Sequence, residues 1–194
     1  SIMGDHSDIY AVRSTGFAIF ASSSPQQVMD LTCIPYLSTL TGHVPFVNFF
    51  DGFRTSHEYN KIDVVDNKIY KKLLDKKALN EFRNKGLNVD NPKTFGTNQG
   101  DNIYFQAVES RNKYYDELPD VVNSYMEKLN KEIGTNYKPF NYYGDKNATK
   151  VIIAMGSVCE TIKEVIDTKK KVGLIEVHLY RPFSSKYFLD VLPK

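Results

Sequence analysis

Two short clusters of polar side chains hold the residue types with which proteins transfer protons and bind anions. The first cluster spans residues 4–8 and places His6 between the carboxylates of Asp5 and Asp8. The second cluster spans residues 51–58 and contributes a carboxylate, a guanidinium, two hydroxyls and an imidazole, from Asp51, Arg54, Thr55, Ser56 and His57. Imidazoles and carboxylates are common general acids and bases, and cations and hydroxyls at a helix N-terminus suit an anionic ligand.

Helix capping and turn formation explain the same residues without any chemistry. Asp8 and Thr55 have positions typical of helix N-caps, and His6 and His57 suit turns. The spacing alone favours this structural interpretation, so it assigns no catalytic role to any residue. It leaves eight candidates for the lining of a site: Gly4, Asp5, His6, Asp51, Arg54, Thr55, Ser56 and His57.

Each cluster follows a segment with strand character. Residues 1–3 resemble the end of a strand, and residues 16–22 are an apolar run of strand length. Residues 26–40 have helical periodicity, and residues 44–50 are expected to form a second, buried strand. The last three segments form a βαβ unit, whose parallel strands end at the same edge of a sheet. Ligands bind at that edge in open parallel sheets, so both clusters lie where a site would form. We also expect Arg54 to be a buried cation.

The C-terminal part of the chain predicts a second βαβ unit. Residues 151–155 are expected to be a buried strand and residues 172–179 a second strand, with a helix between them over residues 158–166. Ser184 is expected to cap a final helix. The predicted fold class is therefore α/β, with two partial doubly wound parallel-sheet units.

The middle of the chain is less regular. The pattern predicts a helix over residues 69–82 with Asp66 as its cap, and a loop over the Asn- and Gly-rich residues 88–102. It predicts a further amphipathic helix that begins just after Asp120, and a domain boundary within residues 130–146.

Composition limits the class of protein. The 194 residues carry a net charge of +2 and are 41% hydrophobic and 25% charged, which is typical of a globular chain. No apolar run approaches the ~18 residues of a membrane helix, and scattered lysines do not form the basic stripe of a nucleic-acid interface. Cys33 and Cys159 are too few for a disulfide framework or for the roughly four thiolates of an iron–sulfur cluster. Phosphate-loop and metal-binding patterns are absent, so no metal ligands are predicted.

Several long strings in this sequence are typical of one enzyme family. These strings are SIMGDHSDIYAVRSTGFAIFASSSPQQVMDL, VPFVNFFDGFRTSHE, GTNQGDNIYFQAVESRNKYYDELPDVVNSYMEKL, VIIAMGSVCETIKEVID and VGLIEVHLYRPFS. Together they cover essentially the whole chain, which closely resembles pyruvate:ferredoxin oxidoreductase, a thiamine diphosphate- and iron–sulfur-dependent enzyme. The related protist enzyme, in which the same module is fused to an NADP-reducing flavoprotein domain, is similar in these strings.

The resemblance implies a fold, a reaction and partners. Residues 1–137 would be the later part of the pyrimidine-binding domain with its helical extension, and residues 138–194 the start of a transketolase-C-like domain. The parent enzyme would convert pyruvate and coenzyme A to acetyl-CoA and CO₂. Electrons would pass through iron–sulfur clusters to ferredoxin, flavodoxin or a fused NADP-reducing domain. Thiamine diphosphate and magnesium would be its other cofactors, and the cytoplasm, or a hydrogenosome-like organelle of an anaerobic protist, its location.

This chain lacks three motifs of the family, which bind the aminopyrimidine of thiamine diphosphate, its diphosphate with magnesium, and the iron–sulfur clusters. We therefore expect the chain alone to be inert and to hold no cofactor, while the eight candidate residues line the site of the parent. Two alternatives stay open: another 2-oxoacid oxidoreductase or transketolase-type enzyme, and a non-catalytic interaction module. The family string FFDGFRTSHE at residues 49–58 argues against the first.

Assembly is the last expectation from the sequence. Both ends of the chain resemble cuts through a larger fold, so each predicted sheet would have uncovered apolar edges. We expect a homodimer or higher species that buries Phe46, Phe49, Ile153 and Leu174 against a neighbour. The alternative is that the two units pack on each other within one chain and share a helix from residues 61–143.

Overall fold

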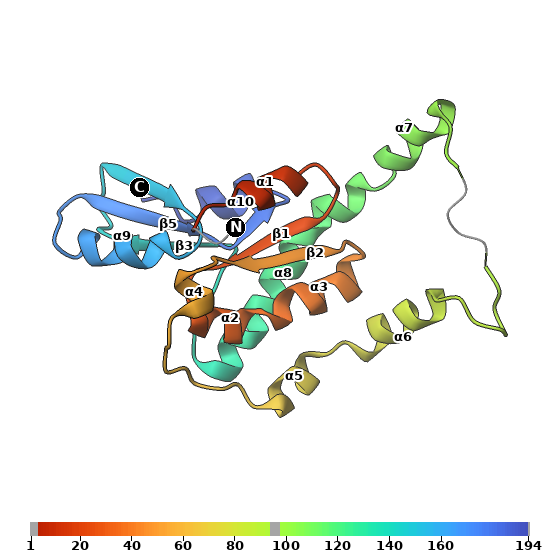
Figure 1. The fold of residues 1–194 in the computed structure, drawn as a ribbon, viewed down its shortest axis with the longest axis horizontal. Helices are drawn as coiled ribbons and strands as arrows, with labels where there is room; N and C mark the ends of the chain where they lie inside the picture. The colour runs from red at the N-terminus through yellow and green to blue at the C-terminus, as the bar shows by residue number, and fades with distance from the viewer. Residues whose placement is uncertain (1–3, 94–97, 194) are drawn as a thin grey trace.

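The computed structural model describes residues 4–93 and 98–193 and places them in two small sheets with helices around them (Figure 1). The first sheet has the strand order β2-β1-β6 and comprises β1 (Ala18–Ser22), β2 (Phe46–Phe50) and β6 (Leu179–Arg181). β1 and β2 run parallel, as the βαβ pattern predicts, whereas β6 is antiparallel to β1. β1 is buried along its whole length because strands flank it and its two faces pack into different hydrophobic clusters, which explains its continuous apolar run.

The second sheet has the strand order β3-β5-β4 and comprises β3 (Phe140–Gly144), β4 (Lys150–Ala154) and β5 (Val172–Val177). Helix α9 (Val158–Ile166) connects the parallel strands β4 and β5, as predicted, while β3 is antiparallel to β5. The α/β class is thus confirmed. Each sheet is mixed, because it contains one antiparallel strand that the periodicity of the sequence does not reveal.

Two strands that the sequence analysis treats as buried lie at sheet edges. Ile153 on β4 is 57% exposed and Phe50 on β2 is 42% exposed. The prediction of buried strands over residues 44–50 and 151–155 is therefore wrong in its burial, although both strands form. The physical reason is that the described part of the chain places no further strand beyond β2 or β4.

Two helices, α2 (Pro25–Leu31) and α3 (Cys33–Gly42), replace the single helix predicted over residues 26–40. Pro35 explains the break. It has no N–H to donate to the carbonyl of Leu31, and its ring would clash with that carbonyl in a continuous helix. α2 therefore ends at Leu31, and Pro35 falls in the first turn of α3, where no N–H bond is needed.

The helix predicted over residues 69–82 is also divided, into α5 (Asn67–Leu73) and α6 (Lys76–Lys85). Asp66 caps α5 as predicted, by accepting a hydrogen bond from the backbone of Lys68. Asp75 acts as a second N-cap, because its side chain accepts from the backbone N–H groups of Lys77 and Ala78. This cap starts a new helix in place of continuing the old one.

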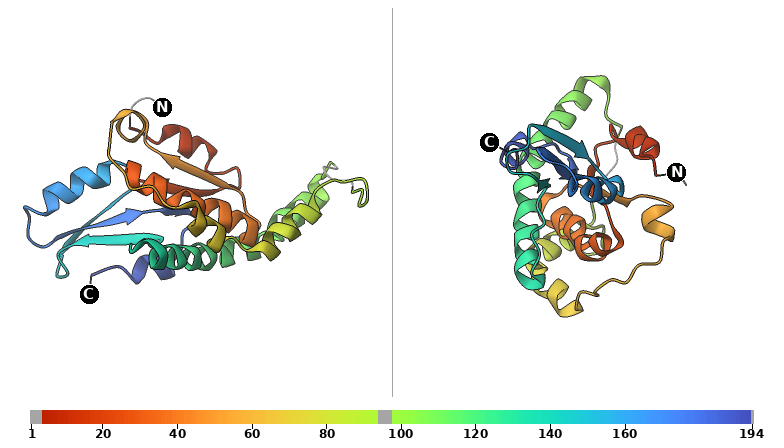
Figure 2. Two further views of the ribbon diagram at one scale, coloured as in Figure 1. Left: turned by 90° about the horizontal axis from the view of Figure 1, so that it is seen from below. Right: turned by 90° about the vertical axis from the view of Figure 1, so that its left-hand side faces the viewer.

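Helix α7 (Asp101–Glu109) begins at the end of the loop predicted over residues 88–102, of which residues 94–97 lie outside the described part. Helix α8 (Asn112–Ile133) corrects the prediction that a helix starts after Asp120, because it begins earlier and contains Pro119. Its apolar face, which includes the fully buried Leu118, is covered along the helix, and this burial outweighs the cost of an internal proline. In Figures 1 and 2 helix α7 lies away from the two sheets.

Three short helices complete the description: α1 (Ser7–Val12), α4 (Arg54–His57) and α10 (Ser185–Leu189). α1 follows directly after the first polar cluster, and α4 lies within the second. α10 begins after Ser184, as the sequence predicts.

The two predicted units share their hydrophobic core. Leu179, on a strand from the C-terminal part, packs with Leu118 and Phe20 in one cluster, and Phe140 packs with residues of β1 and β2 in another. The units therefore pack on each other within the chain and share α8, which is the arrangement that the sequence analysis kept as an alternative. Phe49 and Leu174 are buried inside the chain and cannot be covered by a neighbour, so that part of the assembly prediction is wrong.

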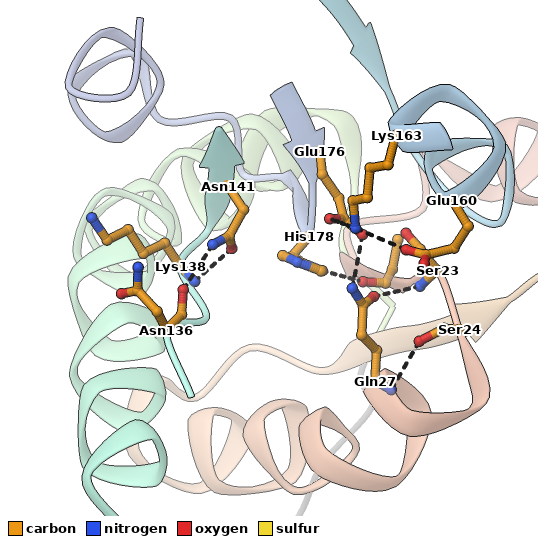
Figure 3. A network of polar contacts seen from close by, with 11 residues as sticks. Ser23, Ser24, Gln27, Asn136, Lys138, Asn141, Glu160, Lys163, Glu176 and His178 are labelled. Carbon is orange, nitrogen blue, oxygen red and sulfur yellow. Dashed lines mark hydrogen bonds and ion pairs between the residues drawn. The ribbon is translucent and has the colours of Figure 1, made fainter. Parts of the chain in front are cut away.

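A buried polar network lies where the two sheets meet (Figure 3). Glu176 on β5 is 3% exposed, and its two carboxylate oxygens contact Gln27 Nε2 and Lys163 Nζ, each at 2.9 Å. Burial of the carboxyl opposes its ionisation, but the surrounding imidazole and ammonium groups and the bond from Gln27 outweigh that effect. The pKa of Glu176 is therefore lowered to about 2.

His178 lies next to this network and is fully buried. Its Nδ1 is 2.9 Å from the carbonyl oxygen of Ala21, which can only accept, so Nδ1 carries the proton. Nε2 has no hydrogen-bond partner in the described residues. The ring stacks on Phe20, and burial lowers the pKa of His178, so the imidazole is neutral at pH 7.

Candidate functional site

The two polar clusters meet in one cleft of about 920 Å³. Its walls come from the loops after β1, β2 and β4 and from the segment before α1, so it lies at the carboxyl ends of three strands. This is where the sequence places a site, because parallel strands of an open sheet end at a common edge.

Six of the eight candidate residues line the cleft: Gly4, Asp5, His6, Asp51, Arg54 and Thr55. The other two lie on the exposed helix α4, outside the cleft lining. There the Ser56 hydroxyl and His57 Nδ1 are 2.6 Å apart, so these side chains contact each other. The structure therefore brings together the N-terminal cluster and the first half of the second cluster.

Asp51 is the centre of the contacts in the cleft. It is 4% exposed and lies directly after β2. One of its carboxylate oxygens, Oδ1, is 2.6 Å from His6 Nε2. The other oxygen, Oδ2, accepts a hydrogen bond from the backbone N–H of Ser157, which follows β4. One carboxylate thus joins three segments that are far apart in the sequence.

Gly156 permits this close approach. Its φ of +85° is in the left-handed region, which side chains other than glycine rarely adopt. A Cβ at this position would also lie 2.7 and 2.8 Å from the two carboxylate oxygens of Asp51 and 2.9 Å from His6 Nε2. Gly156 and Ser157 are not among the predicted site residues. The available signal was a glycine that directly follows a strand.

We expect Gly156→Ala to destabilise the chain more than Gly134→Ala does. Gly134 has a similar φ of +73°, but a Cβ there meets no atom within 4 Å, so this variant is a control for backbone strain alone. The strain costs roughly 1–2 kcal/mol, and the clash with Asp51 and His6 should add roughly 1–3 kcal/mol. Urea unfolding of both variants measures the difference, and equal losses would contradict the packing argument.

Phe53 holds the chain in a strained turn beside Asp51. Its φ of 61° and ψ of −64°, with Arg54 N–H donating to the Gly52 carbonyl at 2.7 Å, define a tight γ-turn. Such a conformation is costly for a residue with a side chain, and strained residues of this kind gather at functional sites. Here the turn lets Asp51 be buried while α4, which follows at once, stays exposed.

The structure corrects the expectation that Arg54 is buried. Its side chain is 68% exposed and pairs with Glu58, one helical turn later, at 2.9 Å. The reason is the γ-turn, which puts α4 on the surface. An exposed pair at this spacing is worth about 0.3–0.5 kcal/mol, so the burial argument for an anion-binding role of Arg54 no longer holds.

Comparison with known proteins identifies the family. Residues 1–127 match the family model described as pyruvate flavodoxin/ferredoxin oxidoreductase, thiamine diphosphate-binding. The chain belongs to this family. Residues 148–193 also match the model described as pyruvate:ferredoxin oxidoreductase core domain II, so two models of this family match the chain one after the other.

Individual relatives agree with the family match along the whole chain. A pyruvate-flavodoxin oxidoreductase of Enterobacter agglomerans is 52% identical over 100% of this chain and 17% of the relative. A pyruvate:ferredoxin oxidoreductase of Moorella thermoacetica is 48% identical, with the same two coverages. A pyruvate dehydrogenase [NADP(+)] of Cryptosporidium parvum is 47% identical over 100% of this chain and 10% of the relative. The chain thus spans about a sixth or less of the curated relatives that it matches.

The cleft residues do not by themselves form a complete thiamine diphosphate site. The carboxylate of Asp51 is already occupied by His6 and Ser157, and Arg54 pairs with Glu58. In residues 4–93 and 98–193 no group of three or more His, Cys, Asp or Glu side chains could hold the metal ion that a diphosphate needs.

Neither cysteine is poised to be a nucleophile at pH 7. Burial raises the pKa of the Cys33 thiol to about 12 and that of Cys159 likewise to about 12. A thiol with such a pKa is protonated at pH 7, whereas nucleophilic attack needs the thiolate.

Within the described ranges, no helix has the length and apolar character to cross a bilayer.

Proposed function

We propose that this chain is part of an enzyme that oxidatively decarboxylates pyruvate with coenzyme A, giving acetyl-CoA and CO₂. The observation that carries the proposal is the single cleft at the ends of β1, β2 and β4, since its walls come from both matched family domains. The names of the relatives support pyruvate as the substrate and flavodoxin, ferredoxin or NADP as the electron acceptor.

In this proposal the chain forms one wall of the active site. Residues 1–137 are the later part of the pyrimidine-binding domain, and residues 138–194 begin the transketolase-C-like domain. Thiamine diphosphate, when bound, supplies the chemistry of decarboxylation. Its magnesium ion and the iron–sulfur clusters are held by other parts of the parent, which we propose to be a homodimer in the cytoplasm or in a hydrogenosome-like organelle.

The assay compares the full-length protein with the 194-residue chain. We expect the full-length protein to reduce methyl viologen only when both pyruvate and coenzyme A are present. The chain alone should show no turnover, because the residues that bind the diphosphate and the clusters are not among its own. Omission of coenzyme A is the control for non-specific reduction.

Two further substrates separate the alternatives. Reduction with 2-oxoglutarate but not with pyruvate would replace the proposed reaction by that of another 2-oxoacid oxidoreductase. Ketol transfer from a sugar phosphate, without viologen reduction, would indicate a transketolase-type enzyme. A full-length protein without any of these activities would leave the interaction module as the better description.

A further inference from the structure

In the cleft the imidazole of His6 contacts the carboxylate of Asp51, which in turn accepts a hydrogen bond from the segment that follows β4 of the second sheet. His6 Nε2 lies 2.6 Å from Asp51, and Asp51 accepts the backbone N–H of Ser157 on its other oxygen. Ser157 directly precedes α9, which follows β4. The carboxylate therefore lies at the N-terminus of α9, where the helix dipole favours a negative charge.

We propose that the turn of Gly156 and Ser157 is a positioning element. Through Asp51 it holds His6 in the tautomer with a proton on Nε2, and leaves Nδ1 to accept a hydrogen bond from an N–H or O–H group of the molecule in the cleft. This inference rests on the proposed function for the identity of that molecule. It adds a specific role for the second matched domain, which is to fix the proton on a side chain of the first.

The hydrogen-bond capacities of the groups determine the tautomer. A carboxylate only accepts hydrogen bonds, so the nitrogen of His6 that contacts Asp51 has to donate. In a neutral imidazole the other nitrogen, Nδ1, then carries a lone pair. In the described residues Nδ1 of His6 forms no hydrogen bond, although His6 lines the cleft. Toward residues 4–93 and 98–193, the ring thus retains one free acceptor position.

Packing against neighbouring aromatic rings fixes the plane of the His6 ring, in addition to the carboxylate that fixes the position of its proton. The edge of the His6 ring meets Phe49 with the ring centroids 5.3 Å apart, and Tyr10 in a similar edge contact at 6.4 Å. Phe49 is itself buried in the core under the cleft. Gly156 has no side chain that would push Asp51 or His6 out of this arrangement. A carboxylate that orients a histidine in this way is a recurrent device in enzyme sites.

The tautomer of His6 can be measured directly by ¹⁵N NMR of the 194-residue chain with labelled histidines. The sequence has four histidines, and His6→Gln identifies the signals of His6. We expect Nε2 to be protonated and Nδ1 to be unprotonated at a pH at which the ring is neutral. The opposite tautomer in the unsubstituted chain would overturn the inference. This measurement does not require enzymatic activity, and it does not require a variant at position 51 to fold.

Asp51→Asn tests the link between the carboxylate and the ring. The amide keeps the shape of Asp51 but offers an N–H group, so the signals of His6 should shift toward protonation of Nδ1. Asp145→Asn is the matched control, because Asp145 also accepts two backbone N–H groups, from Asn147 and Lys171, outside the cleft. Identical His6 signals in a folded Asp51→Asn variant would contradict the inference.

The same substitution in the full-length enzyme gives the kinetic readout. We expect Asp51→Asn to lower kcat for pyruvate by about 10²–10⁴-fold and to alter the pH profile, whereas Asp145→Asn leaves both unchanged. A loss of kcat with an unchanged pH profile would indicate a structural role only and contradict positioning. A full-length protein without pyruvate turnover would remove the proposed function, but the NMR result would still decide the tautomer.

Discussion

Replacing Glu176 with alanine is expected to lower the free energy of unfolding of the 194-residue chain by roughly 3–5 kcal/mol. Glu176 is buried and accepts from both Lys163 and Gln27, so its removal leaves the buried Gln27 amide without its partner and leaves the half-buried Lys163 ammonium with only the exposed Glu160. Removing one member of a buried ion pair is costly because the desolvation of the remaining charge is no longer offset.

Glu160→Ala is the matched control for this prediction. Glu160 contacts the same Lys163 Nζ at 2.8 Å, but its side chain is 50% exposed. Water and salt screen such a pair, so its loss should change stability by less than about 1 kcal/mol. Urea unfolding of both variants checks the contrast. Similar losses for Glu160→Ala and Glu176→Ala would show that burial does not set the strength of this network.

As the pH is lowered, the free energy of unfolding of the chain is expected to fall in two successive pH windows. Burial lowers the pKa of His178 below its ordinary value of 6.5, so below pH 6.5 the unfolded chain binds a proton that the folded chain does not. Stability that is fully present above pH 6.5 is therefore lost as the pH falls. Glu176 acts with the same sign, because its pKa is lowered from 4.5 to about 2. Its contribution is present above pH 4.5 and is lost toward pH 2, by roughly 3 kcal/mol.

Urea unfolding at a series of pH values separates the two windows. His178→Gln keeps an amide N–H that can donate to the carbonyl of Ala21, but it does not titrate. The variant should lose the pH dependence that begins at about pH 6.5 and keep the dependence that Glu176 causes below pH 4.5. A slope in the upper window that is the same in the variant would assign that window to groups other than His178.

Local features of the chain determined most of its secondary structure. The continuous apolar run at residues 16–22 predicted β1, and Asp66 predicted the start of α5, because an N-cap acts on backbone groups only two or three residues away. The position of a cleft after the strands was predictable for the same reason, since parallel strands end at one edge. The family was evident from strings such as VPFVNFFDGFRTSHE alone.

Tertiary structure decided the contacts that give these elements their roles. Asp51 lies 45 residues from His6 and 106 residues from Ser157, and periodicity along the chain contains no information about such partners. It shows which side of an element is apolar, but not which other element covers that side. The pairing of β6 with β1, the burial of α8 across Pro119 and the exposure of Arg54 all depend on that choice. The burial of Phe49, which the sequence analysis expected against a neighbouring chain, depends on the same choice. The free energy of burying an apolar side chain is favourable whichever apolar partner covers it.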